Sequence, residues 1–401
     1  RGRSADRIGL VAFAGEALTQ VPVTLDYAVV EKAVMDLRIG SLEDGTAIGS
    51  GLATAVNRLR RAPDKSKVVL LLTDGENNKG LIDPRTAAAT AAAYGIRVYT
   101  IGVGTIGEAE VFSDGGLDDL FIAYPLVPEG LKAERLRSVA RRTRLRVGTD
   151  SPAGARAIAD ALGEDREGVE VLVEIDSGGR RSGVAPADAV SVAAAARDLG
   201  LRVIGVFTHG GHGYHGPEAR DGAADDEVRC LTEAAASLRS AGIEPTVVSA
   251  GSTPTALGSA RGAVTEERPG TYVFGDRQQV ALGSIAADAV AAVVVARVVS
   301  VNEAGRRVVI DAGAKTLTKD VPAYLTGHGA IPELGAVVAR VSDYHGVVEV
   351  ADGAPLPDIG RVVVVVPNHI CPVVDLFEAF HVASQGEIVD RWRVDARGRS
   401  G

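Results

Sequence analysis

A histidine and a cysteine, His369 and Cys371, stand one residue apart just after a run of five valines. On an extended backbone, side chains two positions apart point to the same side. Imidazole nitrogen and thiolate sulfur are good zinc ligands, and two protein ligands leave positions for substrate and water. Taken by itself, such a pair is structural in most proteins, and a zinc-type metal site is the alternative.

Two glycine-rich loops carry further polar candidates. EIDSGGRRSGV contains Arg181, and THGGHGYHG contains His212 and Tyr214. Each loop follows an apolar run that is typical of a strand, and functional residues of parallel α/β folds lie just after the strands. Taken alone, the same residues are also compatible with ordinary solvated loops.

A turn in SAGSTPT, made by Gly251, Ser252 and Thr253, opens toward a predicted helix. Backbone N–H groups at a helix start, with adjacent hydroxyl groups, suit a phosphate dianion. The turn therefore predicts a phosphate site, with a plain helix cap as the alternative.

Repeated strands and helices must position these loops. Apolar strands alternate with Ala-, Arg- and Glu-rich helical stretches, which predicts a (β/α)8 barrel in an α/β chain. The predicted strands are 120–124, 145–149, 169–175, 202–208, 246–249 and 271–274. From residue 291 the apolar period changes to two, which predicts an antiparallel β domain over 291–401. Before the barrel, KVVLLLTDG (67–75), a helix at 84–94 and a strand at 97–103 predict part of an open parallel sheet.

Two families meet in the segment 97–116, RVYTIGVGTIGEAEVFSDGG. Residues 1–105 resemble a truncated von Willebrand factor A (VWA) domain of the bacterial aerotolerance type. Residues 106–401 resemble the fold-type III pyridoxal-phosphate enzymes of the D-threonine aldolase and D-serine dehydratase family. The resemblance implies an alanine-racemase-like barrel over 106–290, for which 67–103 could supply the missing first strand, helix and strand. A natural fusion and an artificial joining of two genes both remain open.

The VWA resemblance implies a cation site built by three loops, of which Thr46 and Asp74 match the second and third. The first loop is absent, and two loops do not complete the oxygen shell that Mg²⁺ needs. A helix cap at Thr46 and a turn at Asp74 are therefore the preferred interpretation. A protein-binding VWA module with an inactive barrel as passenger is the alternative function.

The fold-type III resemblance implies a lyase that uses pyridoxal phosphate and a divalent metal on small D-β-hydroxy amino acids. It implies that Arg181 reaches the cofactor ring oxygen, that a histidine and Tyr214 lie beside the ring, and that Tyr272 begins the next strand near the cofactor. His369 and Cys371 match the zinc-binding His-x-Cys of the dehydratases, whereas the aldolases commonly have His-x-Asp and use other metals. Dehydration of D-serine is thus favoured over aldol cleavage of D-threonine, and a homodimer is one expected state.

The family's Schiff-base lysine has no counterpart in a matching motif, which predicts impaired activity. Lys79, several residues beyond a predicted strand, is the one candidate substitute, although a surface lysine is the preferred interpretation.

Composition limits the other function classes. The chain has 401 residues, a formal net charge of −9 and 46% hydrophobic residues. The acidic balance argues against a nucleic-acid partner, and no apolar run is long enough to predict a membrane span. Two cysteines form no disulfide framework, which favours a cytoplasmic protein. The chain begins at Arg1 and has its single methionine at Met35, so we expect the native start to precede Arg1.

Overall fold

The computed structural model describes residues 7–14, 16–37, 47–60, 67–70, 96–99, 102–384 and 386–399. Three candidate residues, Thr46, Asp74 and Lys79, lie outside these ranges, as does the predicted helix at 84–94. The chain divides into two compact units, Arg1–Ile101 and Gly102–Gly401. All remaining candidates lie in the second unit.

In the first unit, β1 (Ile8–Phe13) and β2 (Ala17–Thr24) form an antiparallel pair. Helix α1 (Tyr27–Met35) begins where the Asp26 side chain accepts a hydrogen bond from the Val29 N–H, which satisfies a free amide of the first turn. The other elements are α2 (Ile48–Leu59) and the parallel pair β3 (Lys67–Leu70) and β4 (Ile96–Tyr99). The parallel pairing confirms that the predicted strands at 67–75 and 97–103 belong to one parallel sheet.

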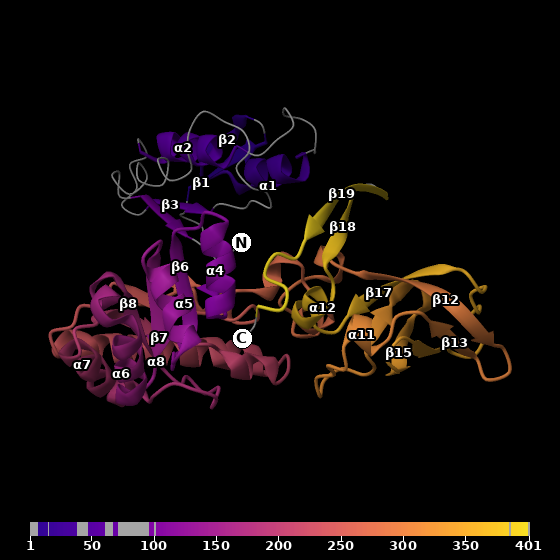
Figure 1. The fold of residues 1–401 in the computed structure, drawn as a ribbon. Helices are drawn as coiled ribbons and strands as arrows, with labels where there is room; N and C mark the ends of the chain where they lie inside the picture. The colour runs from indigo at the N-terminus through magenta and orange to yellow at the C-terminus, as the bar shows by residue number, and fades with distance from the viewer. Residues whose placement is uncertain are drawn as a thin grey trace. The chain divides into compact units, whose positions relative to one another are not determined.

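The second unit begins with a seven-stranded parallel sheet of order β11-β10-β9-β8-β7-β6-β5 (Figure 1). Its strands are β5 (Gly102–Val103), β6 (Asp119–Pro125), β7 (Arg144–Thr149), β8 (Glu170–Glu174), β9 (Arg202–Phe207), β10 (Val247–Ala250) and β11 (Glu266–Glu267). The intervening helices are α4 (Ile106–Asp114), α5 (Leu131–Ala140), α6 (Pro152–Leu162), α7 (Ala189–Asp198), α8 (Ala219–Ser240) and α9 (Ala256–Ser259). This order confirms the predicted alternation of strand and helix. The apolar faces of the helices pack against the outer side of the sheet and bury it.

The parallel sheet curls so that distant strands meet across its inner face. Arg146 on β7 lies 2.7 Å from Glu266 on the edge strand β11, although three strands separate them in the sheet order. Phe121 and Phe207 pack edge to face on the same inner side, with their ring centroids 5.2 Å apart. The curl agrees with the predicted barrel-like architecture.

The predicted strand at 271–274 is wrong: residues Thr271–Val273 form a short 3-10 helix, η4. Tyr272 and Val273 are 52% and 49% exposed, so no neighbouring strand covers them. The last strand of the sheet is instead β11, whose two glutamates gave no apolar pattern to detect. The Glu266 carboxylate accepts a hydrogen bond from the Ser249 hydroxyl and pairs with Arg146, which allows it to lie inside the sheet.

An antiparallel β domain follows, as predicted. Six strands close into a barrel of order β12-β13-β16-β15-β14-β17. They are β12 (Val294–Asn302), β13 (Arg307–Ile310), β14 (Gly329–Ile331), β15 (Ala336–Val341), β16 (Gly346–Glu349) and β17 (Val362–Pro367). Alternate side chains of these strands are fully buried aliphatic residues, among them Val308, Ile310 and Val363. The hairpin β18 (Ala379–Ser384) and β19 (Glu387–Arg393) comes after it.

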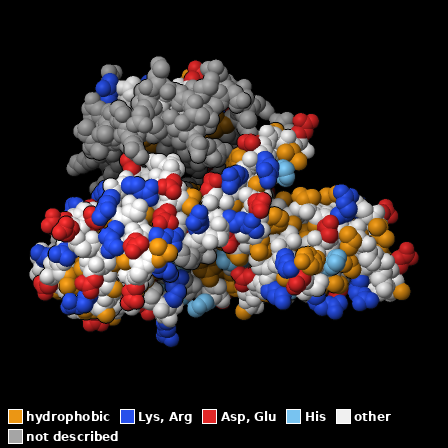
Figure 2. Space-filling view, in the orientation of Figure 1, with side chains coloured by type: hydrophobic (Ala, Val, Ile, Leu, Met, Phe, Trp, Pro, Cys, Tyr) orange, Lys and Arg blue, Asp and Glu red, His pale blue; other side chains and the backbone are white. Residues whose placement is uncertain are grey.

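The charged side chains on the visible face of the molecule are of both signs. Figure 2 shows Lys and Arg intermixed with Asp and Glu on the visible face. Within the described residues, no helix is both long and apolar enough to cross a bilayer.

Candidate functional site

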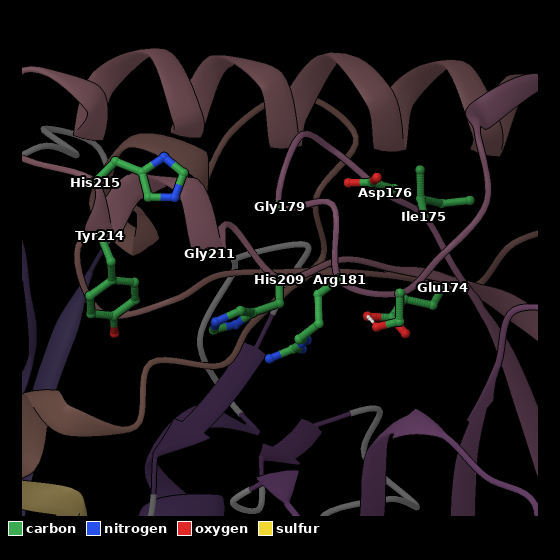
Figure 3. A pocket seen from close by; sticks show the side chains of 10 residues that line it. Glu174, Ile175, Asp176, Gly179, Arg181, His209, Gly211, Tyr214 and His215 are labelled. Atoms are coloured by element: carbon green, nitrogen blue, oxygen red, sulfur yellow. Dashed lines mark hydrogen bonds between the residues drawn. The ribbon is translucent and has the colours of Figure 1, made fainter. Parts of the chain in front are cut away.

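A cavity of about 240 Å³ opens at the carboxyl ends of β8 and β9, where ligands of parallel α/β folds bind. The loop after β8 forms one wall, and the loop after β9, with the short helix η3 (Gly211–Tyr214), forms the other. The lining residues are Glu174, Ile175, Asp176, Gly179, Arg181, Ser182, His209, Gly211, Tyr214 and His215 (Figure 3). Arg181 and Tyr214, both predicted, are among them.

Glu174 brings a buried carboxyl group to this cavity. Its Oε1 accepts a hydrogen bond from the Ser182 hydroxyl at 3.0 Å, whereas Oε2 is buried without a partner among the described residues. Burial raises the pKa of Glu174, and the nearby charge of Arg181 acts in the opposite direction. In Figure 3 the Arg181 side chain extends between Glu174 and His209. The cavity can therefore accept a ligand that carries both a negative charge and a hydrogen-bond donor.

Two histidines of this loop line the cavity, His209 and His215, and the predicted His212 does not. The His209 ring stacks at 6.5 Å on the Tyr214 ring, with an interplanar angle of 23°. Burial, assisted by the charges of Arg268 and Arg181, lowers the pKa of His209 to about 4. Its imidazole is thus neutral near pH 7 and presents an uncharged aromatic face.

The predicted His212 side chain lies outside the cavity lining. Its Nε2 is 3.4 Å from an Asp226 carboxylate oxygen on α8. The imidazole ring lies next to Gly178, in the space that a side chain at that position would occupy. Residue spacing could not distinguish the histidines of this loop, because the short helix η3 rotates successive side chains in different directions.

The turn 251–253, predicted as a phosphate site, already uses two of its backbone N–H groups in hydrogen bonds within the protein. The Gly251 N–H donates to Glu227 Oε1, and the Ser252 N–H donates to the Thr255 hydroxyl. Gly251 has φ 106°, a left-handed conformation that glycine adopts without strain. Thr253 retains a buried hydroxyl with no partner among the described residues. Gly251 and Ser252 therefore build the turn, while Thr253 carries the free group that a ligand could bind.

Tyr272 does not line the cavity and is half exposed in η4. Its neighbour Thr271 is better placed: the Thr271 Oγ1 lies 3.5 Å from the Cys371 Sγ. The Tyr214 hydroxyl interacts with Thr271 and Gln279, and burial raises its pKa. Thr271 thus connects the cavity wall to the His-x-Cys segment, a role that sequence reasoning missed because it carried no motif.

His369 and Cys371 do meet, although only His369 is extended. His369 occupies the position just before α12 (Ile370–Leu376) without a capping side-chain hydrogen bond, and Cys371 lies in the first turn of the helix. Burial alone would lower the pKa of His369, but interactions with Cys371 and Asp320 raise it to about 9. Burial acts to raise the pKa of the Cys371 thiol, but hydrogen bonds from His369 and Thr271 bring it below its usual value. A thiol of lowered pKa next to an imidazole is a suitable donor set for zinc.

Among the described residues, no third side chain joins His369 and Cys371 in an arrangement that could hold a metal. Across the described ranges, no group of three or more His, Cys, Asp or Glu side chains is arranged to hold a metal. The lysines of the second unit, Lys132, Lys315 and Lys319, do not line the cavity.

Three family models match the chain. The alanine racemase N-terminal domain matches 79–278, and a putative serine dehydratase domain matches 291–383. The von Willebrand factor type A domain matches 2–116, so it overlaps the racemase match from Lys79 onward.

Known proteins match most of the chain. A D-threo-3-hydroxyaspartate dehydratase of Delftia sp. (strain HT23) is 35% identical over 330 residues, which cover 77% of this chain and 87% of that protein. A D-threonine aldolase of Arthrobacter sp. is 32% identical over 305 residues, covering 74% and 78%. A solved structure of the Delftia dehydratase has a TM-score of 0.68 at 31% identity and covers 86% of this chain and 94% of that one. The chain therefore belongs to the alanine-racemase-like family that contains D-threo-3-hydroxyaspartate dehydratase and D-threonine aldolase, joined at its N-terminal side to a VWA-type segment.

Proposed function

We propose that the second unit carries a lyase site that uses pyridoxal phosphate and a divalent metal to act on small D-β-hydroxy amino acids. One observation carries the proposal: Tyr214 lines the cavity while its hydroxyl interacts with Thr271, which contacts Cys371. A ligand in the cavity would thus lie near the His369–Cys371 pair. The activities of the Delftia and Arthrobacter relatives support the same substrate class.

The residues present fit the cofactor. The unpartnered Thr253 hydroxyl suits a phosphate oxygen, and Arg181 and neutral His209 suit the ring and its oxygen. Bound pyridoxal phosphate would supply the electron sink that such lyases need. The chain's own part is positioning: Tyr214 keeps its phenol proton at neutral pH, because its pKa is raised, and can donate a hydrogen bond to a substrate oxygen.

The His369–Cys371 pair suits zinc, which would polarise the substrate β-hydroxyl group. Solved structures of a D-threo-3-hydroxyaspartate dehydratase include a histidine variant and a cysteine variant whose substituted positions are two residues apart, the latter in a metal-free form. This spacing supports a metal role for His369 and Cys371. We favour dehydration over aldol cleavage because of Cys371.

Activity is proposed to be limited by the missing lysine. Lys79 is the candidate substitute, since the racemase match begins at that residue. The test is to incubate the full chain with pyridoxal phosphate and zinc, reduce it with borohydride and map lysine adducts by peptide mass, with Lys79→Arg and Lys132→Arg as matched variants. D-serine, D-threonine and D-threo-3-hydroxyaspartate turnover are then assayed.

An adduct that Lys79→Arg removes and Lys132→Arg retains would assign Lys79 as the anchor. Reversible cofactor binding without an adduct, and turnover at the background rate, would establish the impaired form. A chain that neither binds the cofactor nor turns over substrate would contradict the proposal.

The alternative function, a VWA-type module that binds a protein partner through a cation, has one specific support: the match over 2–116. Its candidate ligands Thr46 and Asp74 lie outside the described residues. A protein partner captured only with Mg²⁺, and lost in Asp74→Ala, would favour this function. We also propose a cytoplasmic location, consistent with Cys230 and Cys371 both being free thiols.

A further inference from the structure

A carboxylate faces the imidazole of the metal-site histidine from a different part of the β domain. Asp320 lies in the loop between α11 (Ala314–Leu317) and β14, and its Oδ2 is 2.7 Å from His369 Nδ1. A ring whose Nδ1–H is bound to a carboxylate is held in one orientation and leaves Nε2 for a metal. Asp320 is on the Nδ1 side, so it orients the ligand rather than joining it.

The loop of Asp320 is anchored to the same segment by a second contact. The Asn368 side chain is fully buried, and its Nδ2 donates to the Asp320 carbonyl at 2.9 Å and to the Gly327 carbonyl at 2.8 Å. Main chain and side chain of Asp320 thus contact two consecutive residues, Asn368 and His369. Because the Asp320 backbone is already held by Asn368, its carboxylate loses little additional side-chain entropy when it binds the His369 ring.

The backbone of the His-x-Cys segment is held independently of Asp320. Asp276 is fully buried, and its Oδ2 accepts the N–H of Ile370, the residue between the two ligands, at 3.0 Å. Its Oδ1 accepts the Gln279 N–H and caps α10 (Arg277–Ala281). The Gln278 N–H donates to the Asn368 carbonyl at 3.1 Å. Loss of the Asp320 carboxylate should therefore free the His369 ring without moving the segment.

We propose that Asp320 is a positioning residue that preorients His369 for the divalent ion. The inference rests on the proposed metal role of His369 and Cys371. A site with two protein ligands depends strongly on such orientation, because no other ligand on the described chain compensates for a ring that turns away.

The experiment measures zinc affinity of the full chain by chelator competition for wild type, Asp320→Asn, Asp320→Glu and the control Asp343→Asn. Asp343 is an exposed aspartate of the same domain, beside Lys315. We expect Asp320→Asn to weaken zinc binding about 10- to 100-fold, and Asp320→Glu to recover part of the loss. Asp343→Asn should remain within about twofold of wild type, and apo melting temperatures should stay equal.

A second readout separates orientation from general loosening. In the zinc-loaded wild type, the His369 Nδ1–H should give a slowly exchanging NMR signal, because a carboxylate covers it; in Asp320→Asn that protection should fall. Wild-type zinc affinity in Asp320→Asn, or an unchanged protected signal, would overturn the inference. A wild type that binds no zinc would instead overturn the proposed metal role itself.

Discussion

The interior of the curled parallel sheet and the interior of the closed antiparallel barrel differ in kind. Inside the parallel sheet, Arg146 and Arg268 lie against the ring of Phe121 at 5.5 and 5.7 Å, and Glu266 joins the same interior. Inside the antiparallel barrel, the buried cluster consists of aliphatic side chains. One interior contains charged side chains joined by ion pairs, although Arg146 Nε and Glu267 Oε2 are buried with no partner among the described residues; the other is lined by aliphatic side chains.

The difference follows from what each interior supports. The carboxyl ends of the parallel strands carry the cavity residues Glu174 and His209, and charged groups in the interior below set their electrostatic environment. Burial lowers the pKa of Arg268, while the carboxylates around it, Glu266 first among them, oppose the shift. The antiparallel barrel carries its candidate residues only at one end, after β17, so its interior needs no charge. Polar interiors are costly unless every partner is present.

The largest effect should come from breaking the polar interior. Arg146 is 8% exposed and pairs with Asp119 and Glu266 at 2.9 and 2.7 Å. Arg146→Met should lower the free energy of unfolding by up to about 3–5 kcal/mol, because the partly buried carboxylates of Asp119 and Glu266, 24% and 11% exposed, lose a buried cation. Its neighbour Arg144 is 58% exposed, and Arg144→Met should cost less than about 1 kcal/mol. Urea unfolding followed by circular dichroism checks both, and equal effects would remove the distinction between the interiors.

Breaking the apolar interior should have a comparable or smaller effect. Ile310 on β13 is fully buried, and Ile310→Ala should cost about 2–5 kcal/mol through lost burial and a cavity. Val299 on β12 is 40% exposed, and Val299→Ala should remain within about 0.5 kcal/mol. The same urea titration measures the pair. An Ile310→Ala chain of wild-type stability would mean that apolar burial does not hold this barrel.

The third effect is a change in the pH dependence of the free energy of unfolding. Burial, with the charges of Glu227 and Glu266, raises the pKa of Glu267 to about 8 from an ordinary 4.5. The folded chain therefore retains a proton that the unfolded chain loses, so stability from this group falls as pH rises from about 5 to 8. Glu267→Gln cannot titrate and should show a flatter profile of urea midpoint against pH. A variant whose midpoint falls as steeply as that of wild type would show that Glu267 is not the group responsible.

The sequence predicted most of the second unit. Five of the six predicted barrel strands match β6 to β10, because each is an apolar run with both faces buried. The period of two after residue 291 predicted the antiparallel domain, because each of its strands buries one face and leaves the other more exposed. Short motifs beside strand ends also drew attention to Arg181 and Tyr214, which line the cavity, and to His369 and Cys371, which lie next to each other; their roles remain predictions. The domain limits, the cofactor and the metal remain predictions.

Other features depended on contacts between distant segments. The predicted strand at 271–274 is the 3-10 helix η4, in which Tyr272 is exposed. The strand β11 consists instead of two glutamates: Glu266 pairs with Arg146 and Ser249, and Glu267 accepts a hydrogen bond from Ser259. No local pattern marks a charged pair as a strand when its partners are up to 120 residues away.

Local patterns determined which segments are strands, helices and ligand-bearing loops, because burial of an apolar face has a period that the sequence displays. Tertiary structure alone decided which side chains face one another: His209 rather than His212 in the cavity, Thr271 beside Cys371, and Asp320 on the His369 ring. These choices depend on backbone rotation and on pairs 49 or 100 residues apart. Such contacts depend on how whole helices and strands pack against one another, and the hydrophobic periodicity of a short segment does not predict that packing.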